Sequence, residues 1–76
     1  MSESRPFMVH TAEEGRDAGH TVRAESAPDA AFAFVDRWHP PADASGDVTL
    51  MVTDCETGRR ECLRLDLSDG TAAPCD

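Results

Sequence analysis

The sequence predicts a single small domain of the α+β class, with one helix packed on one face of a four-stranded, mainly antiparallel sheet. Three observations carry this prediction. Residues 26–39 follow the helical period, and two pairs of segments around them alternate as strands do, which gives the order β-β-α-β-β. The length of 76 residues allows one thin core, and a single helix can cover only one face of a sheet.

Three segments make up the chain in this prediction. We expect residues 1–4 to form a disordered tail, residues 5–67 to form the domain, and residues 68–76 to form a C-terminal tail. The tails follow from their composition, since neither shows the alternation of a strand or the period of a helix.

The first two strands alternate clearly. Residues 5–11 place Phe7 and Val9 on one face and Met8 and His10 on the other. A charged loop with two glycines follows. In the second strand, residues 20–25, Val22 and Ala24 point inward while Thr21 and Arg23 point outward.

The helix has recognisable ends. Ser26 is a favourable N-cap, Pro28 is tolerated in the first turn, and Pro40 disfavours helical backbone at His39. One apolar stripe contains Ala27, Ala31, Phe34, Val35 and Trp38. We expect Trp38 to anchor the core between the helix and the leucines of the sheet.

The last two strands give the strongest strand signal. Residues 48–53 and 62–67 both alternate, and Gly58 suits the turn between them. An even-numbered loop puts the apolar set on one face. That set is Val48, Leu50, Val52, Leu63, Leu65 and Leu67. We expect the antiparallel order 2-1-3-4, and a mixed sheet with parallel strands 2 and 3 is the alternative.

The net charge of −8 narrows the classes of partner. Such a surface opposes binding to nucleic acid and to anionic membranes, so we expect neither partner. All seven basic residues are arginine, which either a GC-rich genome or salt adaptation explains. The sequence shows no apolar run of membrane-spanning length and no signal-peptide core. We therefore expect a cytoplasmic protein with three reduced thiols, Cys55, Cys62 and Cys75.

Two runs of sequence resemble a known family. F-V-D-R-W-H-P-P and D-C-E-T-G-R-R-E-C-L-R-L-D-L are similar to runs in small uncharacterised bacterial proteins, a domain of unknown function found mainly among alphaproteobacteria. The resemblance extends from Phe7 to about Cys75. It implies a small α+β fold in a bacterial cytoplasm, and it brings no activity, substrate or catalytic residue.

The residue patterns predict no catalytic, cofactor or metal site. Cys55 and Cys62 flank the hairpin turn and lie diagonally at best, which disfavours a disulfide between them. Zinc usually takes four ligands in closely spaced pairs, and the cysteines and histidines here are scattered. No histidine has a nucleophile or carboxylate at an informative spacing. The sequence therefore favours a protein without enzymatic activity over an enzyme.

The face of the sheet that the helix leaves uncovered is the candidate functional surface. We expect a non-enzymatic interaction module that binds another protein or a second copy through this face. The candidate contact residues are Met8, His10, Arg23, Met51, Cys62 and Arg64. One alternative is a small metal- or thiol-dependent protein that uses Cys62 and His10. Another is an acidic decoy that binds a basic, nucleic-acid-binding protein.

Overall fold

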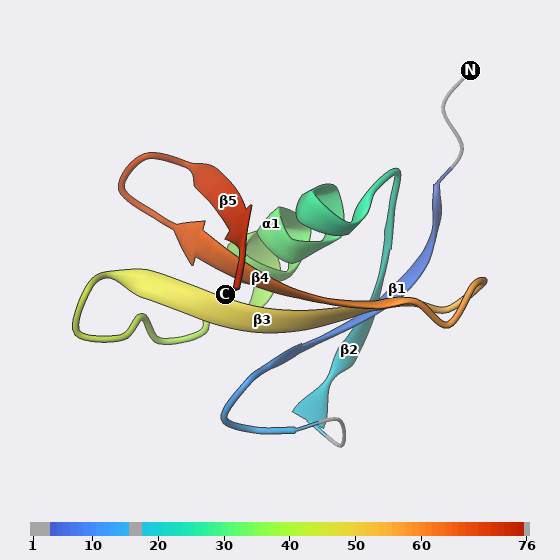
Figure 1. Cartoon of the computed structure of the whole chain (residues 1–76), viewed down its shortest axis with the longest axis horizontal. Helices are drawn as coiled ribbons and strands as arrows, with labels where there is room; N and C mark the ends of the chain where they lie inside the picture. Colours follow the sequence, from blue (N-terminus) through green and yellow to red (C-terminus); the bar gives the residue numbers. More distant parts are fainter. Residues whose placement is uncertain (1–3, 16–17, 76) are drawn as a thin grey trace.

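The computed structural model of the chain describes residues 4–15 and 18–75. The elements in chain order are β1 (Arg5–Thr11), β2 (His20–Ala24), α1 (Ala27–Trp38), β3 (Asp47–Asp54), β4 (Arg60–Asp66) and β5 (Thr71–Pro74). All five strands pair antiparallel in the order β2-β1-β3-β4-β5, and α1 lies across one face of this sheet (Figure 1). The α+β class, the single helix and the order 2-1-3-4 are confirmed, and the parallel alternative is wrong. Most of the predicted N-terminal tail, residues 1–3, lies outside the described residues.

The sheet has a fifth strand where a tail was expected. β5 runs antiparallel to β4, with Leu65 opposite Ala72 and Asp66 opposite Thr71. The turn before it uses Gly70 at φ 70°, and the Asp66 carboxylate accepts hydrogen bonds from the backbone of the turn. The segment T-A-A-P carries little strand propensity of its own, so its pairing depends on the turn and on its neighbour rather than on a local pattern.

The helix forms where its caps predict. The Ser26 hydroxyl accepts a hydrogen bond from the Asp29 amide at 3.3 Å, which satisfies a free donor of the first turn. At the other end His39 adopts the left-handed conformation at φ 49°, and its amide donates to the Val35 carbonyl at 2.9 Å. These caps set where the twelve residues of α1 begin and end.

The core lies between α1 and the sheet face that it covers. Its buried residues are Phe7, Val9, Ala24, Ala30, Ala31, Phe34, Val48, Leu50, Val52, Leu63 and Leu65. The hairpin register places Val48 opposite Leu65 and Leu50 opposite Leu63, as the predicted shared face requires. Ala30 was missing from the predicted stripe. It is buried because the centre of α1 lies close to the sheet, where a small side chain fits.

Two predicted core residues lie outside the core. Trp38 is 37% exposed and Leu67 is 42% exposed, so both predictions are wrong. Trp38 is the last residue of α1, and its ring stacks on His20 at the start of β2, with a centroid distance of 4.0 Å and an angle of 12°. Leu67 follows the last residue of β4 and lies in the turn to β5, where the inward alternation has ended. Phe34, one turn before Trp38, is buried at 3% exposure.

Candidate functional site

The strand register builds the face of the sheet that lies opposite α1, which we call the open face. Successive side chains of a strand alternate between the two faces, so the neighbours of the core residues point to the open face. Directly paired residues form rows across the strands. The central row contains His10, Met51, Cys62 and Cys75; one flanking row contains Thr21, Met8, Thr53 and Arg60; the other contains Thr49, Arg64 and Ala73.

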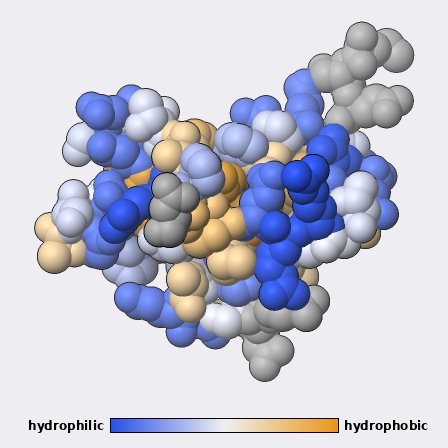
Figure 2. All heavy atoms as spheres, in the orientation of Figure 1, coloured by the Kyte–Doolittle hydropathy of each residue, from blue (hydrophilic) through white to orange (hydrophobic). Residues whose placement is uncertain are grey.

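The register brings the candidate contact residues together on the open face. Met8, Met51 and Cys62 are half-buried in its middle, and His10 is buried beside Met51. Arg23, opposite Pro6, lies at one end and is exposed, as is Arg64 toward the other end. Figure 2 shows apolar atoms gathered in the middle of this face and hydrophilic atoms around them. The sequence therefore predicted the placement of this set, and its role in contacts stays a prediction.

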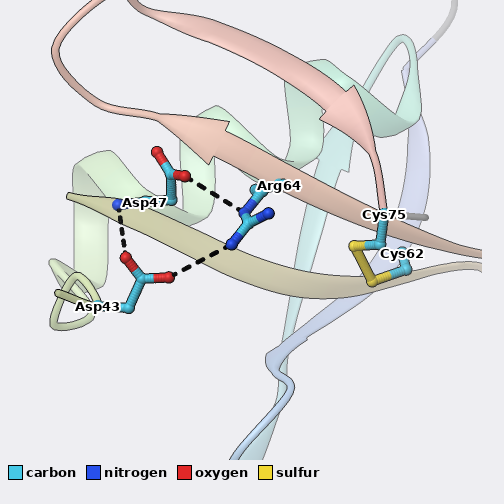
Figure 3. Close-up of a disulfide and its surroundings, with 5 residues drawn as sticks. All are labelled: Asp43, Asp47, Cys62, Arg64 and Cys75. Carbon is cyan, nitrogen blue, oxygen red and sulfur yellow. Dashed lines mark hydrogen bonds and ion pairs between the residues drawn. A yellow bond between two sulfur atoms is a disulfide. The ribbon is translucent and has the colours of Figure 1, made fainter. Parts of the chain in front are cut away.

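A disulfide joins the last two residues of the central row. Cys62 on β4 and Cys75 after β5 form an S–S bond of 2.06 Å (Figure 3). The expectation of three reduced thiols is therefore wrong for this pair, whereas Cys55 is free and exposed. Sequence reasoning missed the bond because it required β5, which places Cys75 beside Cys62 and allows the Cys75 amide to donate to the Cys62 carbonyl at 3.0 Å.

A shallow hollow of about 400 Å³ adjoins the disulfide. Its lining consists of Glu61, Cys62, Leu63, Pro74 and Cys75. Both sulfur-bearing residues are half-buried rather than enclosed. A small molecule can therefore approach the bond from the solvent without passing through the core.

Arg64 is held at the edge of the open face by two carboxylates. Its Nε lies 3.2 Å from Asp47 Oδ2, and its Nη2 lies 3.9 Å from Asp43 Oδ2 (Figure 3). Asp43 also accepts hydrogen bonds from the amides of Asp47 and Ser45. The bond from Asp47 is the largest influence that holds the pKa of Asp43 below its ordinary value of 3.8, and Arg64 adds to it. Arg64 is consequently neutralised by its own chain.

The three histidines occupy separate structural positions. His10 Nδ1 lies 2.9 Å from the Thr11 carbonyl, an arrangement in which the ring nitrogen donates. His20 stacks on Trp38, and His39 caps α1. Within residues 4–15 and 18–75, no group of three or more His, Cys, Asp or Glu side chains is arranged to hold a metal ion. Cys62 is in a disulfide and has no free thiolate in this structure. The hypothesis of a metal- or thiol-dependent protein that uses Cys62 and His10 would need this bond to be reduced.

The covered side has an ion pair that the sequence did not indicate. Asp54, buried at the end of β3, accepts a hydrogen bond from Arg5 Nε at 2.9 Å and two more from the amides of Glu56 and Thr57. The Arg5 bond is the main cause that lowers the pKa of Asp54. A cavity of about 460 Å³ beside this pair is lined by Arg5, Phe7, Ser26, Ala27, Pro28, Val52, Asp54, Thr57, Arg59 and Glu61. The residues that seal it on the sheet side, Phe7 and Val52, belong to the core.

A second cavity, of about 470 Å³, lies at the opposite end of the domain. It is lined by Thr11, Ala12, Glu13, Glu14, Pro41, Ala42, Asp43, Asp47, Val48 and Thr49. Its carboxylates come from two loops and from the start of β3, and Thr11 Oγ1 donates to Glu14 at 3.0 Å.

The described part of the chain holds no helix that is long and apolar enough to cross a membrane.

One comparison with known proteins identifies the family of this chain. No curated protein and no solved structure matches it. The model of a family of unknown function, DUF5961, matches residues 5–76, which is nearly the whole chain and includes every strand and the helix described above. The resemblance seen in the sequence is thus confirmed at the level of a family without known function. The chain belongs to the family DUF5961.

Proposed function

We propose that this protein is a non-enzymatic interaction module whose open face binds a second copy of the chain. The observation that carries the proposal is the composition of that face: half-buried methionines and a disulfide in the middle, Arg23 and Arg60 toward one end, and Asp47, Asp66 and Arg64 toward the other. This composition differs from that of an ordinary solvated sheet face, which is polar throughout.

The size of the domain supports the need for a partner. A chain of 76 residues buries a smaller share of its surface than a larger domain does, and α1 covers only one face of the sheet. Met8 and Met51 remain half-buried on the other face. Methionine suits adaptable contacts, and two sheets that stack face to face exclude water from such side chains.

The distribution of charge on the open face favours a second copy as the partner. Arg23 and Arg60 lie toward one end of the face, and Asp47 and Asp66 lie opposite each other toward the other end. Because Asp47 pairs with Arg64 at 3.2 Å, Asp66 supplies the complementary charge at that end. We place a two-fold axis between the two stacked sheets, parallel to the central row and near Met51. Rotation about this axis puts the arginine end of one copy over the aspartate end of the other. An isologous interface requires this self-complementarity, because the same patch serves both subunits.

Light scattering at micromolar concentration tests the proposal. We expect the wild-type chain to show twice the monomer mass and the Met8→Glu, Met51→Glu double variant to show the monomer mass, because four glutamates would then meet in an apolar interface. The control is Ala33→Glu, Arg37→Gln, which lowers the net charge by the same two units on the exposed surface of α1 and should leave association unchanged. Two folded monomers, wild type and double variant alike, would contradict the proposal.

The cytoplasmic, alphaproteobacterial setting implied by the resemblance belongs to the same proposal. The disulfide argues against the cytoplasmic part of this setting, because such bonds persist mainly in oxidising compartments. Alkylation of thiols in intact source cells, followed by mass analysis of the peptide that contains Cys62, decides the point. A cytoplasmic protein should carry alkylated Cys62 for most of its population, and a fully protected Cys62 would contradict this setting.

A further inference from the structure

We propose that the Cys62–Cys75 disulfide is a reversible redox site, which a dithiol opens and whose opening releases β5 from the edge of β4. The inference concerns the last strand alone and goes beyond the proposed association of two copies. It begins from the position of the bond, which joins β4 to the residue after β5 on the open face (Figure 3).

The bond is within reach of a thiol in the monomer, whose open face no second copy covers. Cys62 and Cys75 are half-buried, and both line the hollow of about 400 Å³ on the surface. Neither contributes to the core between α1 and the sheet. Thiol–disulfide exchange requires a thiolate to approach one sulfur along the bond, so an open surface position favours the reaction over a buried one.

Besides the disulfide, β5 is held by its short ladder with β4 and by the turn at Gly70, but by little apolar burial. Thr71, Ala73 and Pro74 are exposed, and Ala72 alone packs against the core, without being fully buried. A four-residue edge strand with so little buried apolar area has no strong reason to stay paired, whereas a covalent link beyond its last residue keeps its ends close to β4.

The rest of the domain does not depend on β5. In β4, Leu63 and Leu65 are buried by the core cluster, and β4 pairs with β3 over seven positions. Release of β5 therefore leaves α1 and strands β1 to β4 folded. It uncovers the backbone donors and acceptors along the outer edge of β4, a surface that pairs readily with another strand.

The chemistry balances with a dithiol as the reductant. Its first thiolate attacks one sulfur of the disulfide, which forms a mixed disulfide and expels the other cysteine as a thiolate. Its second thiolate then attacks the mixed disulfide, which expels the remaining cysteine and leaves the reductant as a disulfide. Two electrons pass from the dithiol to the protein, and the two thiolates of Cys62 and Cys75 take up the two protons that the dithiol lost.

Hydrogen exchange measured by mass spectrometry tests the release. The protein is the full chain with Cys55→Ser, so that the free thiol cannot shuffle the bond. With dithiothreitol under native conditions, we expect reduction to be complete. The amides that face β4, those of Thr71, Ala73 and Cys75, should then exchange about 100-fold faster, which corresponds to the loss of a short closed loop. Segments of β1, β3 and α1 should keep their protection.

Three results would overturn the inference. The first is a disulfide that dithiothreitol reduces only after denaturation, because the bond is then inaccessible. The second is complete reduction with unchanged exchange in residues 71–75. The third is faster exchange throughout the domain, which would make the disulfide a staple of the whole fold.

Two further samples separate this inference from the others. The Cys62→Ser, Cys75→Ser variant in the same background should show fast exchange in β5 without any reductant, and its core peptides report whether it folds. The monomeric Met8→Glu, Met51→Glu variant should also release β5 on reduction, and its disulfide should be reduced at least as fast as that of the wild type, because no second copy covers it. A wild-type chain that stays monomeric but releases β5 would refute the proposed association and leave the redox site standing.

Discussion

The two faces of the sheet are built by the same strands and differ in what covers them. On the covered face, Phe7, Val9, Leu50, Val52 and Leu65 are at most 1% exposed. On the open face, the alternate residues of the same strands include half-buried methionines and a disulfide. The contrast shows that the chain covers one face of its sheet with its own helix and leaves the other face without a covering element. Folding depends on the covered face, and the proposed association would use the open face.

The largest expected difference is between two substitutions that each add a carboxylate, one on the covered face and one on the open face. Leu65→Asp should abolish cooperative unfolding, because Leu65 is fully buried and the new charge would have no partner in the core. The matched variant Thr53→Asp puts the same residue on the open face opposite Arg60, where it should cost less than about 1 kcal/mol. Circular dichroism during urea denaturation compares the two. Equal stability of the two variants would break the distinction between the faces.

A second comparison lies within α1, between two aromatic residues one turn apart. Phe34→Ala should lower the free energy of unfolding by about 3–5 kcal/mol, because Phe34 is 3% exposed and its removal leaves a cavity in the core. Trp38→Ala should cost only about 1–2 kcal/mol, since its ring is partly exposed and stacks on His20. Urea denaturation of both variants measures the difference. A larger cost for Trp38→Ala would restore Trp38 as the core anchor.

These aromatic residues show where sequence periodicity stops being informative. The period identified the helix and its stripe, but it could not show that the ring of Trp38 stacks on His20 at the edge of the sheet and stays 37% exposed. The alternation of β3 and β4 predicted which residues share a face, because a slip by one residue would have buried the polar set. It left Cys62 opposite either Met51 or Thr53, and the structure places it opposite Met51.

The C-terminal strand shows a different limit. Three of its four residues are exposed, so no alternation of apolar and polar side chains marks it. Cys75, the residue after this strand, forms a disulfide with Cys62 over a sequence separation of 13. The turn at Gly70 brings the two cysteines together. The Arg5–Asp54 pair was missed for the same reason, since 49 positions separate the two residues. Long-range polar contacts leave no periodic signal in one sequence.

A third prediction sharpens the account of the covered face through its dependence on pH. The Arg5 hydrogen bond holds the pKa of Asp54 below its ordinary value of 3.8, so the folded protein binds fewer protons than the unfolded chain between the two values. The stability from this pair is therefore present above that range and is lost as the pH falls through it. Asp54→Asn should be less stable than the wild type at neutral pH.

The measurement is the free energy of unfolding of both proteins as a function of pH. The difference between them should shrink below a pH of about 4, where the wild-type carboxylate takes up its proton. Asp36→Asn, on the exposed surface of α1, is the control and should show no comparable convergence. A constant difference from neutral to acidic pH would contradict the role of the Arg5–Asp54 pair.

The smallest expected effect concerns the charged ends of the open face. Arg60→Glu should weaken self-association about 5-fold, because it places like charges opposite each other at the rim of the interface. Arg37→Glu makes the same change on the exposed end of α1 and should leave the dissociation constant unaltered. Sedimentation velocity over a concentration series measures both. Equal weakening by the two substitutions would point to net charge rather than to the open face.

The most direct test of the central claim identifies the face that meets the second copy. In a mixture of isotope-labelled and unlabelled chains, isotope-filtered NMR detects contacts between protons of different copies. Our account predicts such contacts for the methyl groups of Met8 and Met51, and none for Phe34 in the core or for the exposed Ala33 of α1. Intermolecular contacts at α1 with none at Met8 or Met51 would contradict it.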